Sequence, residues 1–555
     1  MLKGHPKGLL VAFFANMGER FGYYTMLAIF VLYLQAKFGY DTQTAGQIYG
    51  GFLFGIYFLP LLGGLIADNW LGYGKTILLG TIVMFLGYLL LAMPGLGIFY
   101  VLVALGIISL GTGLFKGNLQ ALVGNMYDDP KYSANRDNAF NIFYMGINIG
   151  AFFAPSAAEG ISNWILGREG LVYNSKIPHL AHEYLAGKLK DTTEFLALAQ
   201  QQMGDKFTNL TEFANLYIDT LSKSYNAGFA IAAASMIVSF LIFIGFRKHY
   251  KSADVTEKQK SKDETLQNHT VELTPEETKD RLIALFLVFF VVIFFWMAFH
   301  QNGFTLTIFA RDYTQNQVDK YTYLLFDLKA LLPVIASIIG IIMMFNRKLS
   351  AKIKALGGAI FVIGLGLAMW AVGTFDEKML ITPAKFQHFN PIFIVFMTPL
   401  IISFFSWLRK KKKEPSTPRK IGLGMTITAF GFLFMVLASL GLPSPGFLQA
   451  HPEAQYTLVS PYWLISVYFI LTIAELFLSP MGISFVSKVA PPKYKGLMQG
   501  GWLGATAVGN LLAGLIGALW EKIELWQFFG ILVLMALLSA LFIFAVIKKL
   551  EKVTS

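Results

Sequence analysis

Long apolar segments separated by short polar connections recur along almost the whole chain of 555 residues. An α-helix needs about 20 apolar residues to cross a hydrocarbon core of about 30 Å. Fourteen segments have about this length, at 8–34, 44–67, 75–93, 97–123, 138–160, 226–246, 282–303, 324–345, 354–373, 388–408, 421–440, 461–485, 498–518 and 526–547. The pattern therefore predicts an all-α integral membrane protein with 14 transmembrane spans.

Two hydrophilic stretches divide this pattern. Residues 248–280 are rich in both charge signs and have no apolar face, so we expect a cytoplasmic linker there. It would separate an N-terminal six-helix bundle, residues 1–247, from a C-terminal part, residues 281–555. The stretch 161–225 spaces its Leu and Phe residues as a helix does, which predicts surface helices on the periplasmic side. This insert is either a solvated cap or a docking site.

The composition is that of a membrane protein, because 55% of the residues are hydrophobic and only 14% are charged. Lys and Arg gather in a few connections, at 346–354, 409–420 and 487–495, and in the C-terminal tail. The positive-inside rule then places these connections and both termini in the cytoplasm. This bias accounts for the formal net charge of +12, so we expect no nucleic-acid partner. The chain has no cysteine, which excludes disulfides and thiolate metal sites.

The first span carries charged residues, which are costly in hydrocarbon. The sequence NMGERFGYY gives Asn16, Glu19, Arg20, Tyr23 and Tyr24 helical spacing, so they lie on one stripe that must face protein or water. A charged pair can simply lock two helices together, but ionisable groups within spans more often mark a transport pathway. Basic residues precede this span as in a signal peptide, but no cleavage site follows, so we expect it to be retained.

Other spans of the first half also carry polar residues. Lys116 lies near the middle of the fourth span, where its ammonium group cannot easily reach the membrane surface, and Thr112 and Gln120 share its helix face. In the fifth span, Tyr144 and Asn148 are one turn apart, so they can hydrogen-bond a ligand or each other.

The second half contributes a carboxylate and a histidine. The sequence AELFLSPMG places Glu475 and Ser479 on one small-residue face, and FFWMAFHQNG places Trp296 and His300 on another. A buried histidine is often only structural, but within a membrane it is better suited to handling a proton or a ligand. Further candidates in this half are Asn390 and Trp502.

Opposite charges in separate halves form a clamp for a zwitterion. A substrate carboxylate would lie near Arg20 and Lys116, and an ammonium group near Glu475. Aromatic residues could line the pocket for varied side chains, namely Tyr23, Tyr24, Tyr57, Trp296 and Trp502. A short free peptide has this shape and polarity.

These residues resemble the motifs of a known family, the proton-dependent oligopeptide transporters of the major facilitator superfamily. ERFGYY resembles the family's first-helix motif ExxERFxYY, FYMGINIGAF its fifth-helix signature FYxxINxG, and FWMAFHQNG its seventh-helix pattern FWxxFEQxG. GGLIADNWLGYGKT resembles the superfamily loop between helices two and three, in which Asp68 is expected to hold the inward gate. The motifs occur in the family's order, and the resemblance covers nearly the whole chain.

The resemblance implies the major facilitator fold, in which two six-helix bundles rock about a central site and the two extra spans, within 324–373, are accessory helices. It implies import of di- and tripeptides by alternating access, coupled to protons. The implied peptide-binding residues are Arg20, Tyr24, Tyr57, Lys116, Asn148, Trp296, Asn390, Glu475, Ser479 and Trp502. The residues expected to take part in proton coupling are Glu19, His300 and Glu475. We expect a monomer as the functional unit, in a bacterial inner membrane.

Departures from the family pattern bear on the coupling. The family's first glutamate is replaced here by Asn16, which cannot titrate, and its seventh-helix acid is replaced by His300. The histidine that mammalian relatives carry on the second helix is also missing, with Gly50 in its place.

Our first hypothesis is a peptide:proton symporter in which His300 is the titrating group. Imidazole changes its charge near external pH. Protonated His300 would repel Arg20 or attract Glu475, and this change would determine which of the two gates opens more readily. Glu19 would hold Arg20 in orientation.

Other functions stay open. Because Asn16 is always neutral, the chain is alternatively a peptide facilitator without proton coupling, or depends on Glu475 alone. It could also carry another small zwitterion, or an anion such as nitrate, although Glu475 would repel an anion. We expect no enzyme, because the chain lacks HExxH and GxSxG, and no use of ATP, because it lacks GxxxxGK[ST]. A pure channel fits the opposed charges less well than alternating access. No cofactor or metal is expected, and the partners are peptides, protons and the lipid bilayer.

Overall fold

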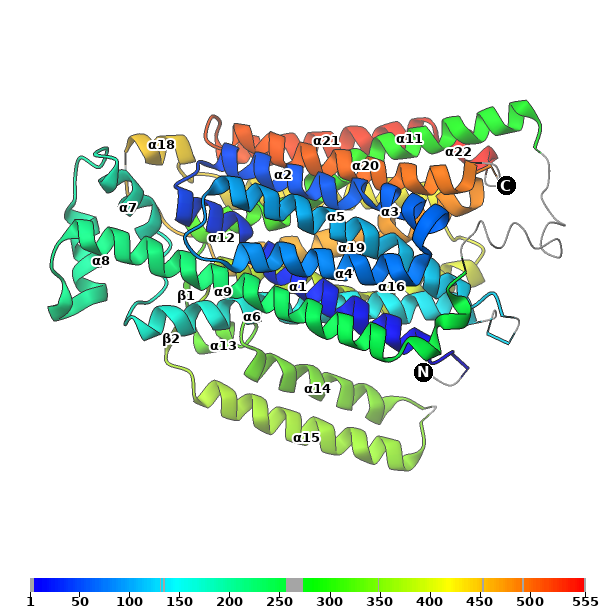
Figure 1. Cartoon of the computed structure of the whole chain (residues 1–555), viewed down its shortest axis with the longest axis horizontal. Coiled ribbons are helices and arrows are strands. Elements are labelled where there is room, and N and C mark those ends of the chain that lie inside the picture. The colour runs from blue at the N-terminus through cyan, green and yellow to red at the C-terminus, as the bar shows by residue number, and fades with distance from the viewer. Residues whose placement is uncertain are drawn as a thin grey trace.

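The computed structural model describes residues 4–129, 131–132, 135–255, 273–347, 349–451, 454–491 and 494–553. Long helices run side by side through the molecule, and both ends of the chain lie at the same end of the bundle (Figure 1). We call this the terminal end. The short helices α7 (Ile177–Leu185), α8 (Thr193–Met203) and α18 (Pro445–Ala450) lie at the opposite end, which we call the insert end.

The first half of the chain, up to residue 255, forms one set of packed helices. Its long elements are α1 (Gly8–Phe38), α2 (Thr42–Phe58), α3 (Pro60–Ile66), the π-helical turn η1 (Ala67–Leu71), α4 (Tyr73–Ala92), α5 (Ile98–Asn125), α6 (Arg136–Arg168) and α9 (Leu210–Gly245). The short 3-10 turns η3 (Gly204–Lys206), η4 (Arg247–His249) and η5 (Lys251–Ala253) complete it. Most of the predicted linker 248–280 lies outside the described residues, at 256–272.

The second half begins with α11 (Pro275–Phe299), whose first turn is closed by a reciprocal capping pair between Thr274 and Glu277. Its other main helices are α12 (Thr305–Asp312), α14 (Leu328–Phe345), α15 (Ala351–Gly373), α16 (Phe389–Lys410), α17 (Thr417–Ser439), α19 (Pro461–Val489), α20 (Lys495–Ile516) and α21 (Leu525–Ala545). Shorter elements are η7 (His300–Gly303), α13 (Lys320–Tyr323), η8 (Pro383–His388), η10 (Gly517–Leu519) and α22 (Ile547–Lys552).

Thirteen helical segments in the described part of the chain are long and apolar enough to cross a membrane. The predicted span at 138–160 corresponds to α6, which is 33 residues long but carries several Asn, Ser and Glu residues and is not among the thirteen. The all-α membrane fold is therefore confirmed, and the count of 14 spans is consistent with the structure.

The helix boundaries differ from the prediction around the insert. The sixth span was predicted to start at 226, but α9 already begins at Leu210, where the Asn209 side chain accepts a hydrogen bond from the Glu212 backbone. Phe213 continues the apolar side of α9 into the insert and packs against Phe195 of α8, with ring centroids 5.6 Å apart. The insert therefore consists of surface helices that lean on an extension of α9.

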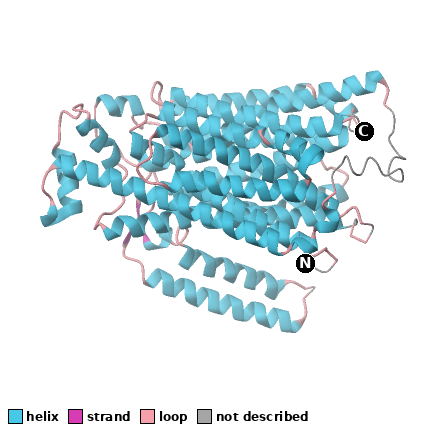
Figure 2. Ribbon diagram, viewed as in Figure 1, coloured by secondary structure: helices cyan, strands magenta, loops and turns pink. Residues whose placement is uncertain are grey.

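A two-stranded sheet was not predicted. Strand β1 (Gln317–Asp319) pairs antiparallel with β2 (Lys378–Leu380), with Val318 opposite Met379. Figure 2 shows the strands near the open end of the helical hairpin formed by α14 and α15, and this hairpin lies along one edge of the bundle. The two hairpin helices approach closely because Gly340, Gly357 and Gly364 leave no room for a side chain between them.

Glycines also join the two halves. On α2, a Cβ atom at Gly50 would lie 2.9 Å from the Cα atom of Gly514 on α20, and Gly46 and Gly514 are in similarly close backbone contact. The position where mammalian relatives carry a histidine therefore has no space for any side chain in this arrangement.

Candidate functional site

The charged residues of α1 form a buried ion pair. Arg20 donates from Nε to Glu19 Oε2 over 2.5 Å and from Nη2 to Glu19 Oε1 over 2.6 Å. The two side chains are only 4% and 1% exposed. The guanidinium also lies 4.8 Å from the ring centroid of Tyr23. Because Glu19 occupies Nε and Nη2, Nη1 remains the guanidinium nitrogen for a further partner.

Lys116 lies beside this pair, on α5. Its ammonium nitrogen is 3.8 Å from the ring centroid of Tyr57, a cation–π contact between α5 and α2. It interacts electrostatically with Arg20 and Glu19. No ion-pair partner of Lys116 is found within the described residues, so the first half holds more positive than negative charge here.

The second half places a carboxylate between α19 and α16. Asn390 donates its Nδ2 hydrogens to Glu475 Oε2 over 2.9 Å and to Thr472 over 3.0 Å. Glu475 is only half-buried. Its Oε1 atom has no hydrogen-bond donor in the described part of the chain, so it can accept one from a ligand.

His300 lies where the two halves meet. It starts η7, the 3-10 turn that interrupts the helix between α11 and α12. Its ring is 5.2 Å from that of Trp296 and 6.2 Å from that of Tyr57, measured between centroids. Its Nδ1 atom lies 3.2 Å from the Trp296 carbonyl oxygen, and Lys116 is close enough to interact with the ring electrostatically.

Both charged poles act on the same two tyrosines. Tyr24 on α1 and Tyr57 on α2 each interact electrostatically with Arg20 and with Glu475. The structure thus brings the predicted poles of opposite charge to one region between the halves. We call these residues the central cluster: Arg20, Tyr24, Tyr57, Lys116, Trp296, His300, Asn390, Glu475 and Ser479.

Several polar atoms of this region lack a partner. Trp296 Nε1, Ser479 Oγ and Asn16 Nδ2 are buried, and none has a hydrogen-bond partner among the described residues. Leaving such groups without a partner is costly, so a polar ligand or water is needed to satisfy them. The site is thus suited to a molecule with several hydrogen-bonding groups as well as two charged ends.

Asn148, Trp502 and Asp68, which were also predicted, make other contacts. Asn148 on α6 is half-buried and donates to the Tyr144 carbonyl over 3.1 Å. Trp502 is 6% exposed and its ring fills the space beside Gly482 of α19, so it closes the packing between α19 and α20. Asp68 lies in η1 at the terminal end, where it accepts a hydrogen bond from Tyr73 over 3.0 Å.

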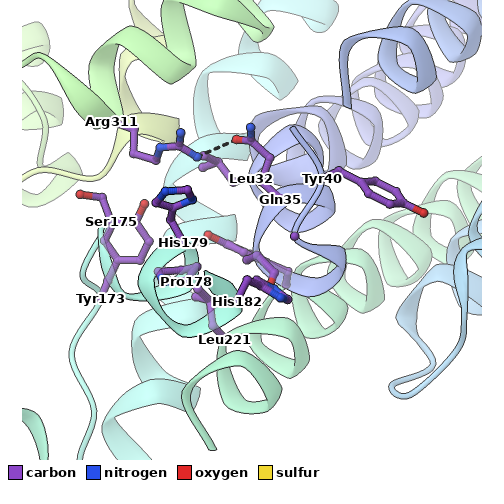
Figure 3. Close-up of a pocket in the computed structure, with 13 residues that line it drawn as sticks. Leu32, Gln35, Tyr40, Tyr173, Ser175, Pro178, His179, His182, Leu221 and Arg311 are labelled. Carbon is purple, nitrogen blue, oxygen red and sulfur yellow. Dashed lines mark hydrogen bonds between the residues drawn. The ribbon is translucent and has the colours of Figure 1, made fainter. Parts of the chain in front are cut away.

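Polar contacts join the halves at the insert end, and sequence reasoning missed them. Arg311 of α12 donates from Nη1 to Gln35 of α1 over 2.6 Å and pairs with its neighbour Asp312. Figure 3 shows Arg311 at a cavity of about 90 Å³ that is otherwise lined by the first half, including His179 and His182 of α7. A second contact runs from the Thr42 backbone to Glu521 over 3.0 Å.

A third contact across the halves is the ion pair between Glu159 and Lys385. The only signal in the sequence is a lone acid late in the fifth span and a lone lysine just before the segment 388–408.

Comparison with known proteins identifies the family. The family model PTR2, described as the POT family, matches residues 74–273 and 328–531, which is well over half of the chain. This protein belongs to the POT family. The predicted membership of the oligopeptide transporters is thereby confirmed. The first-helix and seventh-helix motifs lie outside the matched residues, so they support the assignment independently.

Two curated relatives of this POT-family chain are named as peptide transporters. It is 28% identical over 543 residues to the peptide transporter YePEPT of Yersinia enterocolitica, covering 93% of this chain and 88% of that one. It is 26% identical over 585 residues to a di-/tripeptide transporter of Lactococcus lactis, covering 99% and 96%. The protein is thus a multi-span transporter of a family that carries peptides.

Solved structures of the family share the fold. A POT family transporter in complex with 5-aminolevulinic acid superposes with a TM-score of 0.67 at 21% identity, covering 100% of this chain and 98% of that one. A peptide transporter POT in complex with sulfate gives 0.66 at 23% identity, with 100% and 96% covered. The predicted major facilitator fold is therefore confirmed.

Proposed function

We propose that this POT-family protein imports di- and tripeptides by alternating access, coupled to protons. The observation that carries the proposal is the placement of Arg20 and Glu475 on opposite halves around the same two tyrosines, Tyr24 and Tyr57. Such a site matches the two charged ends of a free peptide.

The bound peptide would use the atoms that the protein leaves free. Its carboxylate would lie between Arg20 Nη1 and the Lys116 ammonium group, and its ammonium group would donate to Glu475 Oε1. Trp296 Nε1 and Ser479 Oγ have no partner within the described residues, so they are available to the peptide backbone. These polar groups would fix the backbone and leave the side chains to aromatic surroundings such as Tyr24 and Tyr57, which suits substrates of varied sequence.

The two halves would rock about this site. We assign residues 1–247 and 281–555 to the two bundles, residues 248–280 to the linker and residues 324–373 to the accessory pair. The lysine-rich connections favour a cytoplasmic terminal end, which makes the insert end periplasmic in a bacterial inner membrane. Asp68 would then belong to the inner gate, and a monomer suffices because both poles come from one chain.

Proton coupling would act through His300, Glu19 and Glu475. His300 contacts Tyr57 of the first half and lies near Lys116. A positively charged His300 ring would therefore repel Lys116 and Arg20 and attract the carboxylate of Glu475. Glu19 would keep Arg20 oriented through their two hydrogen bonds. The charge change would thus act directly on the groups that hold the peptide.

Uptake of a labelled dipeptide into proteoliposomes tests this proposal. We expect uptake to rise with an inward proton gradient, to be competed by unlabelled tripeptide and to be absent from protein-free liposomes. In His300→Gln, we expect dipeptide binding to remain and the dependence on the gradient to disappear. Gradient-driven uptake that is undiminished in this variant would reject His300 as the titrating group, and absence of dipeptide transport by the unaltered protein would reject the function.

A second candidate is a peptide facilitator without proton coupling, favoured by the neutral Asn16 at the position of the family's first glutamate. Counterflow of dipeptide that ignores the proton gradient would support this function. Transport of nitrate is disfavoured by Glu475 in the central cluster, and competition of dipeptide uptake by nitrate would test it.

A further inference from the structure

A buried ion pair joins the halves away from the central cluster. Lys385 of η8 lies 2.7 Å from Glu159 Oε2 of α6, and the two side chains are only 5% and 8% exposed. Thr382 donates its hydroxyl hydrogen to Glu159 Oε1 over 2.8 Å. Glu159 follows Asn148 by 11 residues on the same helix, which places it about 16 Å further toward the insert end. The pair is thus separate from the proposed peptide clamp.

The two partners differ in what they retain if the halves separate. Lys385 also donates to the Tyr323 hydroxyl over 3.1 Å and lies 4.7 Å from that ring's centroid, and Tyr323 belongs to the same half. Both hydrogen bonds recorded for Glu159, from Lys385 and Thr382, come from the opposite half. Separation would therefore remove both of these partners from the Glu159 carboxylate, which then stays charged only at a cost unless it takes up a proton.

A proton acceptor lies on the same face of η8. In a 3-10 helix, residues three apart lie above one another, so Lys385 and His388 share one side. His388 Nε2 lies 3.0 Å from the Leu325 carbonyl oxygen and must be the donor there, which leaves the lone pair on Nδ1. Nδ1 is buried and has no hydrogen-bond partner among the described residues. His388 also contacts Phe152 of the first half, with ring centroids 6.0 Å apart.

The titratable or charged groups that surround the ion pair are few. Tyr323 contacts Lys385 directly, and Asp327 acts on Tyr323 electrostatically while its carboxylate caps the start of α14 through the Lys329 backbone. His388 is within electrostatic reach of Lys385. Apart from Lys385 and Thr382, no hydrogen-bond donor to Glu159 is found among the described residues.

We propose that Glu159 is a proton-binding site of the transport cycle and that Lys385 drives the proton off. This inference rests on the proposed function. When the halves part at the insert end, the Glu159 carboxylate takes a proton from outer water and becomes neutral, while Lys385 stays with Tyr323. When they close again, the Lys385 ammonium group returns with all three of its protons. The carboxyl proton then leaves Glu159 and passes through water between the two halves to His388 Nδ1. From His388 it moves on to the central cluster.

This site would supply a titratable carboxylate in place of those missing from two family positions. The family positions associated with coupling carry Asn16 and His300 here. Glu159 pairs with a cation when ionised and releases it when protonated, which is the property that Asn16 has lost. Because His388 is followed closely by Asn390, which holds Glu475, the proton route leads from the outer contact toward the peptide clamp.

The test compares peptide counterflow with peptide-driven proton influx in proteoliposomes that contain a pH-sensitive dye. In Glu159→Gln we expect counterflow to persist and peptide-driven proton influx to fall to the level of protein-free liposomes. Gln35→Leu is the matched control, because it removes another contact across the halves without removing a carboxylate, and it should keep the proton:peptide ratio of the unaltered protein. An unchanged ratio in Glu159→Gln would overturn the proton site. Absence of counterflow in the unaltered protein would instead contradict the proposed function.

A second variant keeps the proposal testable if Glu159→Gln does not fold. Lys385→Met leaves the carboxylate without its cation, so Glu159 should hold its proton up to a higher pH. We expect the pH of half-maximal counterflow to rise by about one unit or more, because a nearby opposite charge shifts a carboxylate by about that amount. An unshifted pH profile in Lys385→Met would overturn the proposal.

Discussion

Removal of the negative pole should weaken the binding of free peptides selectively. In Glu475→Gln, the amide oxygen can still accept the hydrogen bond that Asn390 now donates to the carboxylate over 2.9 Å, so the local packing should survive. What disappears is the charge that faces the peptide ammonium group. A hydrogen bond to a charged group contributes about 1.5–3 kcal/mol, and about 1.4 kcal/mol corresponds to a tenfold change in Kd. We therefore expect the Kd of a free dipeptide to rise by about 10- to 100-fold.

The assay is a binding titration of the purified protein with dialanine and with N-acetyl-dialanine. The acetylated peptide has no ammonium group, so it should bind weakly to the unaltered protein and with nearly the same Kd to Glu475→Gln. Glu194→Gln, an exposed acid of the insert, is the matched control and should bind both peptides as the unaltered protein does. Equal losses for the free and the acetylated peptide would refute the reasoning, because the variant would then have damaged the site as a whole.

Three further predictions follow from other contacts. Lys116→Met should raise the Kd of free dipeptide by about tenfold and leave that of a C-terminally amidated dipeptide unchanged; equal effects on both would show that Lys116 does not meet the carboxylate. Hydrogen bonds from Arg409 and Lys420 hold the pKa of Glu414 at about 2, below its usual 4.5, so they add stability that is complete above about pH 4.5 and fades toward pH 2. Glu414→Gln should thus lower the thermal unfolding midpoint at pH 7 and lower it less near pH 3; an equally large decrease of the midpoint at both pH values would contradict this prediction. Gly514→Ala should reduce transport strongly, because the added Cβ would overlap the backbone of α2; normal counterflow would show that the helices can part.

The spans and the charged residues within them could be predicted because their signals are local. An apolar run long enough to cross a bilayer needs no knowledge of its neighbours, and a charge within such a run, such as Arg20 or Lys116, is costly enough to imply a function. The pairing of Arg20 with its own neighbour Glu19 is also a local contact. The spacing of Trp296 and His300 correctly placed both rings together.

Contacts between distant parts of the chain could not be predicted. Thr382 and Glu159 are 223 positions apart, and the local sequence around either residue does not indicate a contact with the other. Lys385 lies just before an apolar segment, where a lysine is ordinarily a solvated loop residue. The strands β1 and β2 are three residues each and are separated by two long helices. Three residues are too few for an alternation of apolar and polar positions that would predict a strand. Such features depend on how the halves pack, which a single sequence does not encode in any local pattern.

The early start of α9 has a similar cause. The first turns of α9 were predicted only as part of the surface helices of the insert, but apolar contacts with those helices hold them in one continuous helix with the sixth span. Tertiary packing thus overrides the local pattern, as it commonly does at helix ends.

The structure of the protein with a bound dipeptide, determined by electron cryomicroscopy, tests the central claim most directly. We expect the peptide carboxylate within hydrogen-bonding distance of Arg20 and Lys116, and the ammonium group at Glu475. A dipeptide bound in the reverse direction, or bound away from these three side chains, would contradict the claim that opposite charges on the two halves hold the substrate by its ends.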